Sequence, residues 1–229
     1  MKTTILIPCY NEENTIEKIV NKILEINEVE KEIIIIDDCS SDNTKKILKE
    51  NLVNKVNKII FNEKNFGKGY CIREGIKVAS GDIVLIQDAD LEYDPSDYHK
   101  MIKPILKGNA DVVYGSRFKS SDETRILFFW HTVGNKFLTL LSNIFTNLNL
   151  TDMEVCYKAF KTEIIKNIDL KENRFGFEPE ITAKVSKLNI RIYEVGIKYF
   201  GRTYKEGKKI KTTDGFVALF CIIKYSLIK

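Results

Sequence analysis

Residues 80–95 read Ser-Gly-Asp-Ile-Val-Leu-Ile-Gln-Asp-Ala-Asp-Leu-Glu-Tyr-Asp-Pro, a short apolar run followed by closely spaced carboxylates. The run Ile83–Ile86 predicts a buried strand. If the backbone stays extended beyond it, side chains at i and i+2 share a face, so Asp88, Asp90 and Glu92 converge. Converging carboxylates repel one another unless a proton or a cation intervenes, and oxygen ligands suit Mg²⁺ or Mn²⁺. A solvated acidic turn fits the same residues, and the stretch by itself leaves both interpretations open.

Strand and helix patterns alternate through the first half of the chain. β-branched or apolar runs predict strands at residues 2–8, 32–38, 58–61 and 83–86. Apolar residues at helical spacing follow the first strand, and a glycine-rich turn opens another helix after the third. This alternation is typical of βαβ crossovers. The sequence therefore predicts an α/β fold with a Rossmann-like, mostly parallel central sheet flanked by helices.

Four polar features fall at the carboxyl ends of these predicted strands. They are the turn Tyr10–Glu12, the pair Asp37-Asp38, the glycine-rich loop Gly67–Gly69 and the cluster Asp88–Glu92. Each has an ordinary explanation in turn chemistry, but open α/β sheets bind their ligands at this edge. The spacing of the glycines fits neither a Walker loop nor a Rossmann fingerprint. The shared location of the four features predicts a ligand site at this edge of the sheet.

Size and composition exclude several classes of protein. The 229 residues can bury a substantial core, and a formal charge of +4, with Lys and Glu mixed along the chain, does not suggest nucleic acid binding. Five scattered cysteines without a Cys-x-x-Cys pair argue against zinc and against a disulfide framework, and favour reduced thiols in a cytosolic protein. No apolar run reaches the ~20 residues that span a bilayer. The first residues enter a strand pattern at once, so we expect no signal peptide.

Five motifs occur in the order and spacing of a known family: Pro8-Cys9-Tyr10-Asn11-Glu12, Asp37-Asp38-Cys39-Ser40-Ser41-Asp42, Asn65-Phe66-Gly67-Lys68-Gly69, Ser80-Gly81-Asp82 with Asp88-Ala89-Asp90, and Gly115-Ser116-Arg117. With these motifs the chain resembles the family 2 glycosyltransferases of the GT-A fold, and within them the dolichyl-phosphate mannosyltransferase and polyprenyl-phosphate glycosyltransferase branch. The resemblance is strongest over residues 3–117. It implies one GT-A domain over residues 1–229, with a nucleotide-sugar-binding half at 1–117 and an acceptor-binding half at 118–229.

The resemblance also implies a nucleotide pocket. Its expected residues are Pro8, Tyr10, Glu12, Asp37, Asp38, Lys68, Asp88, Arg202 and Lys208. Asp38, with Asp37 beside it, would hold the base or the ribose. Arg202 and Lys208 belong to a basic stretch, residues 202–211, that would fold over the diphosphate when the donor binds.

A divalent cation, Mg²⁺ or Mn²⁺, is the cofactor that the resemblance implies. Asp88 and Asp90 would bind it, with Glu92 where the lipid-phosphate branch often has Gln. Such a cation stabilises a leaving diphosphate, which is the group that a nucleotide sugar releases. Asp90 is for this reason also counted with the catalytic residues.

Two further catalytic candidates lie in the second half of the chain. The resemblance places Arg117 near an acceptor phosphate, which a bidentate guanidinium suits. A second arginine is usual in that branch, and His131 stands in the corresponding place here. Asp152 is the candidate base or orienting group, with Glu154 second, and Glu178 is a candidate contact to a sugar hydroxyl. If the acceptor is a phosphate dianion, no strong base is required.

Two apolar segments, residues 125–150 and 215–228, carry the remaining open question. Either they form core helices, or they form C-terminal amphipathic helices that lie on a membrane surface beside a lipid acceptor. Many proteins of the resembling branch continue into membrane helices at this point, so a separate membrane protein is a conceivable partner.

Three functions remain open at this stage. The favoured one is a metal-dependent inverting glycosyltransferase, peripheral at the cytoplasmic face of a membrane, that moves a hexose from a GDP-mannose or UDP-glucose type donor to a polyprenyl or dolichyl phosphate. The second is the same catalyst acting on a glycan or glycolipid hydroxyl, with Asp152 as the base. The third is a nucleotide-sugar-binding subunit without turnover, against which the complete carboxylate set and the basic stretch argue.

Overall fold

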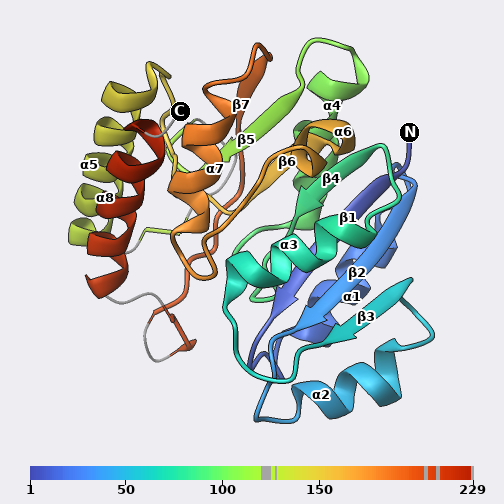
Figure 1. Cartoon of the computed structure of the whole chain (residues 1–229). Helices are drawn as coiled ribbons and strands as arrows, with labels where there is room; N and C mark the ends of the chain where they lie inside the picture. The colour runs from blue at the N-terminus through green and yellow to red at the C-terminus, as the bar shows by residue number, and fades with distance from the viewer. Residues whose placement is uncertain (120–124, 127, 204–205, 210–211, 228–229) are drawn as a thin grey trace.

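The computed structural model of the protein describes residues 1–119, 125–126, 128–203, 206–209 and 212–227 (Figure 1). Leu127 of the first apolar segment and Tyr204, Lys205, Ile210 and Lys211 of the basic stretch lie outside the described residues.

A seven-stranded sheet forms the centre of the molecule. Its strands are β1 (Thr3–Cys9), β2 (Lys31–Asp37), β3 (Lys58–Phe61), β4 (Ile83–Ile86), β5 (Val112–Ser116), β6 (Lys158–Lys161) and β7 (Ile192–Gly196). They are arranged in the order β3-β2-β1-β4-β6-β5-β7, and β6 runs antiparallel to both of its neighbours while the other pairs are parallel. The predicted α/β fold with a mostly parallel sheet is confirmed. The antiparallel strand β6 was not predicted.

Helices cover both faces of the sheet. In chain order they are α1 (Ile16–Glu25), α2 (Thr44–Ile47) with a π-helical turn (Leu48–Leu52), α3 (Lys68–Val78), a 3₁₀ turn (Pro95–Asp97), α4 (Tyr98–Leu106), α5 (Phe129–Thr146), α6 (Thr162–Lys166), α7 (Phe177–Val185) and α8 (Thr212–Leu227). Figure 1 shows α3 on the near face and α1 on the far face. The faces alternate because the chain passes from β1 outward to β2 and β3 and then returns to pair β4 with the other side of β1. This reversal is a topological switch point, where open α/β sheets bind ligands.

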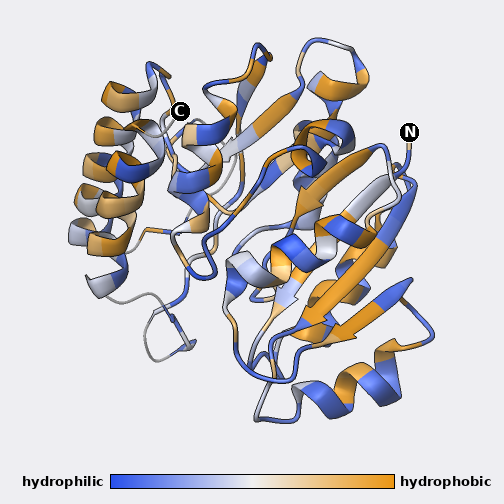
Figure 2. Ribbon diagram, viewed as in Figure 1, coloured by the Kyte–Doolittle hydropathy of each residue, from blue (hydrophilic) through white to orange (hydrophobic). Residues whose placement is uncertain are grey.

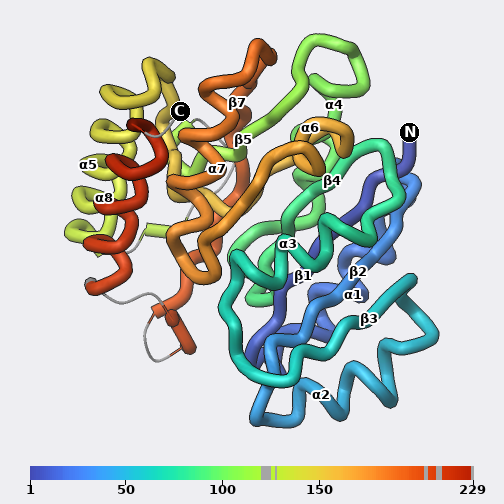
Figure 3. The backbone as a smooth tube through the Cα atoms, in the orientation of Figure 1, coloured from blue at the N-terminus to red at the C-terminus, as the bar shows by residue number. Residues whose placement is uncertain are grey.

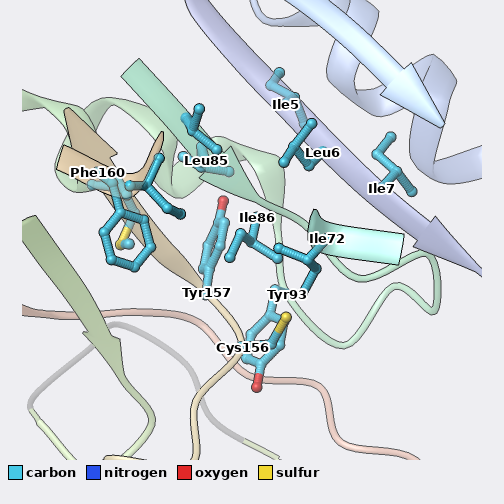
Figure 4. Packing of buried hydrophobic residues seen from close by; sticks show 14 of the residues in the cluster. Ile5, Leu6, Ile7, Ile72, Leu85, Ile86, Tyr93, Cys156, Tyr157 and Phe160 are labelled. Atoms are coloured by element: carbon cyan, nitrogen blue, oxygen red, sulfur yellow. The ribbon is translucent and has the colours of Figure 1, made fainter. Parts of the chain in front are cut away.

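The core lies directly behind this switch point. Ile5, Leu6 and Ile7 of β1 and all of β4 are fully buried. Figure 4 shows Ile86 of β4 beside Tyr93 and Tyr157, whose rings stack with centroids 5.3 Å apart. The strand ends that carry the polar motifs are therefore fixed by rigid packing, which suits a binding site.

Helices α5 and α8 form a separate layer beside α7, on the side of the molecule away from β1–β3 (Figures 1 and 3). The fully buried residues of α5 are the polar Thr139 and Ser142, whereas large apolar residues face outward. Leu138 and Leu141 pack against the hydrophobic core, so one face of α5 fits the interpretation as a core helix, and the role of its outer face stays open. No helix in the described part of the chain is both long and apolar enough to span a bilayer.

Candidate active site

The carboxylates after β4 converge through a turn, not through an extended strand as the sequence suggested. The backbone turns at residues 89–91, with Leu91 in the left-handed region at φ 65°. The side-chain amide of Gln87 braces this turn by donating to the carbonyl oxygens of Asp88 (3.1 Å) and Tyr93 (3.2 Å). Burial, together with the nearby charges of Asp88 and Glu92, raises the pKa of Asp90 to about 7. A cation at this turn would relieve that repulsion.

Arg202, from the segment after β7, supplies a positive charge to this cluster. Its Nη2 lies 2.9 Å from Oδ2 of Asp90, and its Nη1 lies 3.2 Å from Oε2 of Glu12. Its backbone N–H donates to Oε1 of Glu92 at 2.8 Å. Lys209 adds a second cation, with Nζ 2.6 Å from Oε1 of Glu12. The structure thus joins the β1 turn, the β4 turn and the basic stretch, as the motifs predict for one site.

Lys68 neutralises the remaining aspartate of the cluster. Its Nζ lies 3.0 Å from Oδ1 of Asp88 and 3.2 Å from Oε1 of Glu178. The thiol of Cys156 also donates to Oδ1 of Asp88, at 3.0 Å. Glu178 stands in the first turn of α7, where a carboxylate is also favoured by the helix dipole. It connects α7 to the switch point through Lys68.

The predicted metal ligands are consequently held by internal cations. Among the described residues no three His, Cys, Asp or Glu side chains form a ready metal-binding group. Mg²⁺ is often bound by one or two carboxylates together with substrate phosphates and water, so a complete protein cage is not required. The oxygen-only donor set suits such an ion, and Nε of Arg202 is buried without a hydrogen-bond partner, which shows that the guanidinium fills the position imperfectly. The residues present therefore fit a hard divalent cation, and their assignment as its ligands stays a prediction.

The two aspartates at the end of β2 shape the surrounding loops. Asp38 accepts from the backbone N–H groups of Phe66 (2.9 Å) and Gly67 (2.7 Å). Gly67 has φ +103°, and a Cβ there would lie 2.4 Å from the carbonyl oxygen of Asn173, so only glycine fits. Asp37 accepts from the Ser40 hydroxyl at 2.5 Å. Both carboxylates thus build the rim of the site, and their contact to a base or ribose stays a prediction.

Pro8 and Tyr10 lie at the β1 end of the same edge. Pro8 is the penultimate residue of β1, and Tyr10 is 36% exposed directly after it. Nζ of Lys209 lies 5.7 Å from the centroid of the Tyr10 ring and also donates to the Tyr10 carbonyl oxygen. Tyr10 thus lies at the rim of the site with Lys209 over its ring, and the contact of Pro8 and Tyr10 to a nucleotide stays a prediction.

Arg117 and Asp152 form a closely bonded pair at the carboxyl end of β5. Nη2 and Nε of Arg117 lie 2.6 and 2.7 Å from the two oxygens of Asp152, and the Arg117 backbone N–H donates to the same carboxylate at 3.0 Å. Asp152 is wholly buried, and both of its oxygens accept from Arg117. The Tyr199 ring packs against the guanidinium, with its centroid 5.4 Å from Cζ. This geometry fixes the direction of the guanidinium.

Lys208 extends the positive charge from Arg117 toward Phe128 and His131 at the start of α5. Nζ of Lys208 lies 5.9 Å from the Phe128 ring centroid, and that ring lies 5.4 Å from the His131 ring. The pKa of Lys208 is lowered overall. Burial is the main cause, the charge of Arg117 also lowers the pKa, and the charge of Glu92 partly opposes both. Burial, and then the charge of Lys208, lower the pKa of His131. Lys208 is therefore within electrostatic reach of both the β4 carboxylates and Arg117.

A second acidic group lies beneath the site. Burial, together with the charge of Glu178, raises the pKa of Glu154 to about 8. Lys158, which is fully buried, donates to the carbonyl oxygens of Met153 (3.3 Å) and Val155. Within the described part of the chain, one carboxyl oxygen of Glu154 and one of Glu178 have no hydrogen-bond partner. Glu154 is consequently uncharged near pH 7.

Sequence reasoning missed three residues of the site. Tyr199 donates its hydroxyl to Oε2 of Glu92 at 3.1 Å, while Lys209 and Cys156 contact Glu12 and Asp88 as described above. Lys209 stands in the basic stretch that the sequence singled out, so charge clustering was a usable signal. For Tyr199 and Cys156 no local pattern indicated a role.

Fold and site together define an α/β protein with a charged site at the switch point of its sheet. The family model described as Glycosyl transferase family 2 matches residues 4–169. The chain belongs to this family and is a glycosyltransferase, as the motifs predicted.

Named relatives fall within the predicted branch of the family. The chain is 32% identical to a UDP-N-acetylglucosamine–dolichyl-phosphate N-acetylglucosaminyltransferase of Methanococcus voltae, over 96% of this chain and 94% of that protein. It is 28% identical to the dolichol-phosphate mannosyltransferase of Pyrococcus furiosus, over 92% of this chain and 61% of that protein.

The fold is shared with a solved glucosyl-3-phosphoglycerate synthase of Mycobacterium tuberculosis in complex with Mn²⁺, UDP and glucosyl-3-phosphoglycerate. The TM-score is 0.77 at 18% identity, over the whole of this chain and 81% of that one. The GT-A assignment is thereby confirmed.

Proposed function

We propose that this protein is a metal-dependent inverting glycosyltransferase that moves a sugar from a nucleotide diphosphate donor to a polyprenyl phosphate at a membrane surface. The observation that carries the proposal is the position of Arg117, a guanidinium fixed by a wholly buried Asp152 and packed on Tyr199, whose hydroxyl contacts Glu92 of the carboxylate edge. The names of the relatives support a lipid-phosphate acceptor and make UDP-N-acetylglucosamine the first donor to test, beside GDP-mannose and UDP-glucose.

The donor would bind in the half formed by residues 1–117, with its diphosphate at the β4 turn. A bound divalent cation on Asp88 and Asp90 would supply Lewis-acid stabilisation of the leaving diphosphate. Arg202 and Lys209 would hold phosphate oxygens, because both reach the turn from the basic stretch. Lys68 keeps Asp88 in place from the opposite side. These charges offset the repulsion between the anionic donor and the anionic carboxylates.

The acceptor would bind in the half formed by residues 118–229, against Arg117 and Lys208. A phosphate dianion is already ionised at neutral pH, so attack needs orientation and charge neutralisation more than a base. Asp152 suits this chemistry as an orienting group, because both of its oxygens accept from Arg117. A hydroxyl acceptor would require Asp152 to leave Arg117 and take up a proton, which the bidentate pair opposes.

A membrane surface is the proposed partner of α5 and α8. Residues exposed on the two adjacent helices form apolar stripes at helical spacing: Trp130, Val133, Phe137, Leu140 and Ile144 on α5, and Phe216, Phe220, Ile223 and Leu227 on α8. Trp130 is 77% exposed and Phe216 74%. Figure 2 shows how much of these two helices is hydrophobic. Outward apolar stripes, with the cation Lys208 over Phe128 at the start of α5, fit an amphiphile with a phosphate head group.

A transfer assay tests the proposal directly. The purified protein is incubated with Mn²⁺, a labelled nucleotide sugar and vesicles that contain polyprenyl phosphate, and the lipid fraction is analysed for a glycosyl phosphate product. Vesicles with the matching free polyprenol are the control. We expect product only with the phosphorylated lipid. Transfer to the alcohol would establish the hydroxyl-acceptor alternative, and binding without turnover on any donor would establish the non-catalytic one.

A further inference from the structure

Arg202 pairs with two of the three carboxylates that are predicted to bind a divalent cation, Asp90 and Glu92. Its guanidinium is within 2.9 Å of Asp90, 3.2 Å of Glu12 and 3.6 Å of Glu92, and its side chain is only 14% exposed. These carboxylates come from the ends of β1 and β4, so one guanidinium placed among them offsets part of the negative charge of the acidic edge. A metal ion that binds there must compete with Arg202.

The guanidinium is an imperfect occupant of this position. Its Nε–H is buried without a hydrogen-bond partner, because the nearest carboxylate oxygen, on Glu92, is 3.6 Å away. A buried donor without an acceptor costs free energy. The main chain is held independently, since the Arg202 backbone N–H donates to Glu92 at 2.8 Å and the Gly201 carbonyl accepts from Arg125 at 3.1 Å. The side chain can therefore leave while the main chain keeps its anchors.

We propose that Arg202 stands in for the divalent cation in the free protein. The guanidinium leaves the carboxylates, so that the cation can bind them, only when a nucleotide diphosphate offers the guanidinium a new partner. The inference rests on the proposed function. A metal ion alone would displace Arg202 and leave the guanidinium without its carboxylates. A diphosphate accepts a guanidinium in bidentate geometry, so metal and nucleotide together compensate for the lost contacts. Metal and nucleotide then bind cooperatively, and Arg202 is the origin of that coupling.

Mn²⁺ affinity measured with and without nucleotide tests this mechanism without any turnover. Free Mn²⁺ is followed by electron paramagnetic resonance in the wild type and in Arg202→Gln, each alone and with saturating UDP or GDP. Arg191→Gln is the matched control: it also removes one arginine from an ion pair, at the opposite end of the sheet, on Asp111. We expect Arg202→Gln to bind Mn²⁺ about tenfold more tightly in the absence of nucleotide, the order expected when contacts to charged groups no longer compete. The factor by which nucleotide tightens Mn²⁺ binding should fall by at least the same amount, and Arg191→Gln should match the wild type.

Other outcomes overturn the inference in distinguishable ways. If Arg202→Gln binds Mn²⁺ alone no better than the wild type but loses nucleotide affinity, Arg202 is only a diphosphate ligand. If the wild type binds no Mn²⁺ even with either nucleotide, the metal-dependent function fails as well. Arg202→Lys guards against misfolding of the glutamine variant. It keeps the charge but not the planar fork, so it should bind free Mn²⁺ with an affinity between those of the wild type and Arg202→Gln, and an affinity no tighter than that of the wild type would contradict the mechanism.

Discussion

Asp152→Asn separates an orienting role from a base role, because the substitution removes the charge and keeps the shape. Asp152 is wholly buried and receives three hydrogen bonds from Arg117, at 2.6, 2.7 and 3.0 Å. Removing one partner of such a buried pair leaves the other charge uncompensated, which typically costs about 3–5 kcal/mol of stability. We therefore expect a clear fall in melting temperature. The catalytic effect needs a separate estimate.

The two roles predict different losses of activity. If Arg117 binds the acceptor phosphate, Arg117→Ala removes a contact to a charged group worth about 1.5–3 kcal/mol, or roughly 10- to 150-fold in kcat/KM. Asp152→Asn keeps the arginine but loosens its direction, so it should cost no more than Arg117→Ala and leave the shape of the pH profile unchanged. If Asp152 were a general base, its loss should lower the transfer rate by about 10²–10⁴-fold. The dependence of the rate on deprotonation of Asp152 should also disappear from the pH–rate profile.

The assay follows transfer to polyprenyl phosphate by both variants from about pH 6 to about pH 9, together with thermal unfolding. Asp111→Asn is the matched control, because Asp111 also binds an arginine in bidentate fashion, Arg191, at the other end of β5. That control should lose stability without a change in acceptor KM. An Asp152→Asn protein that is folded and inactive, beside an Arg117→Ala protein near wild-type activity, would refute the phosphate-acceptor reasoning.

Three further outcomes are expected. Asp90→Asn, or chelation with EDTA, should remove most activity and most metal-dependent nucleotide binding while the fold stays intact by circular dichroism; full activity in either case would contradict the metal site. Glu154→Gln should stabilise the protein at pH 8 by on the order of a few kcal/mol: the folded protein keeps the Glu154 proton up to about pH 8, whereas the unfolded chain releases it near its ordinary pKa of 4.5, so wild-type stability falls as pH rises between these values. A melting temperature with the same pH dependence in both proteins would argue against this. Trp130→Ser combined with Phe137→Ser should weaken co-sedimentation with anionic vesicles, and high salt should weaken it in the wild type, whereas Leu106→Ser, an exposed apolar control on α4, should have no effect; a wild type that stays in the supernatant at low salt would remove the support for membrane contact.

Local patterns predicted the parts of the fold that depend on near neighbours. The apolar runs that became β1–β4 end where the sequence placed their polar motifs. The position of the acidic edge could therefore be predicted from the hydrophobic pattern of the strands and from the turn residues that follow them. The antiparallel strand β6 did not, because Lys158–Lys161 is a four-residue strand with lysines at both ends and no clear alternation. Its place in the sheet is set by pairing with β4 and β5.

The same distinction applies to the site. Asp88 and Asp90 could be identified from spacing, but the turn that brings them together depends on Leu91 at positive φ, which a leucine rarely adopts. The contact between Arg202 and Glu12 spans 190 positions in the chain, and the one between Arg117 and Asp152 spans 35. No period or motif encodes such pairings, because they exist only after the sheet has placed the strand ends beside one another.

The charges at the edge of the sheet explain why the two halves of the chain need each other. Glu12, Asp90 and Glu92 come from the first half, and Arg202 and Lys209, which neutralise them, come from the second. Neither set could be buried alone without a large desolvation cost. A donor with its metal brings both signs of charge, so it can replace each half of this arrangement without leaving a buried ion unpaired. The contacts that hold the site together in the free protein are therefore the contacts that substrate binding must exchange.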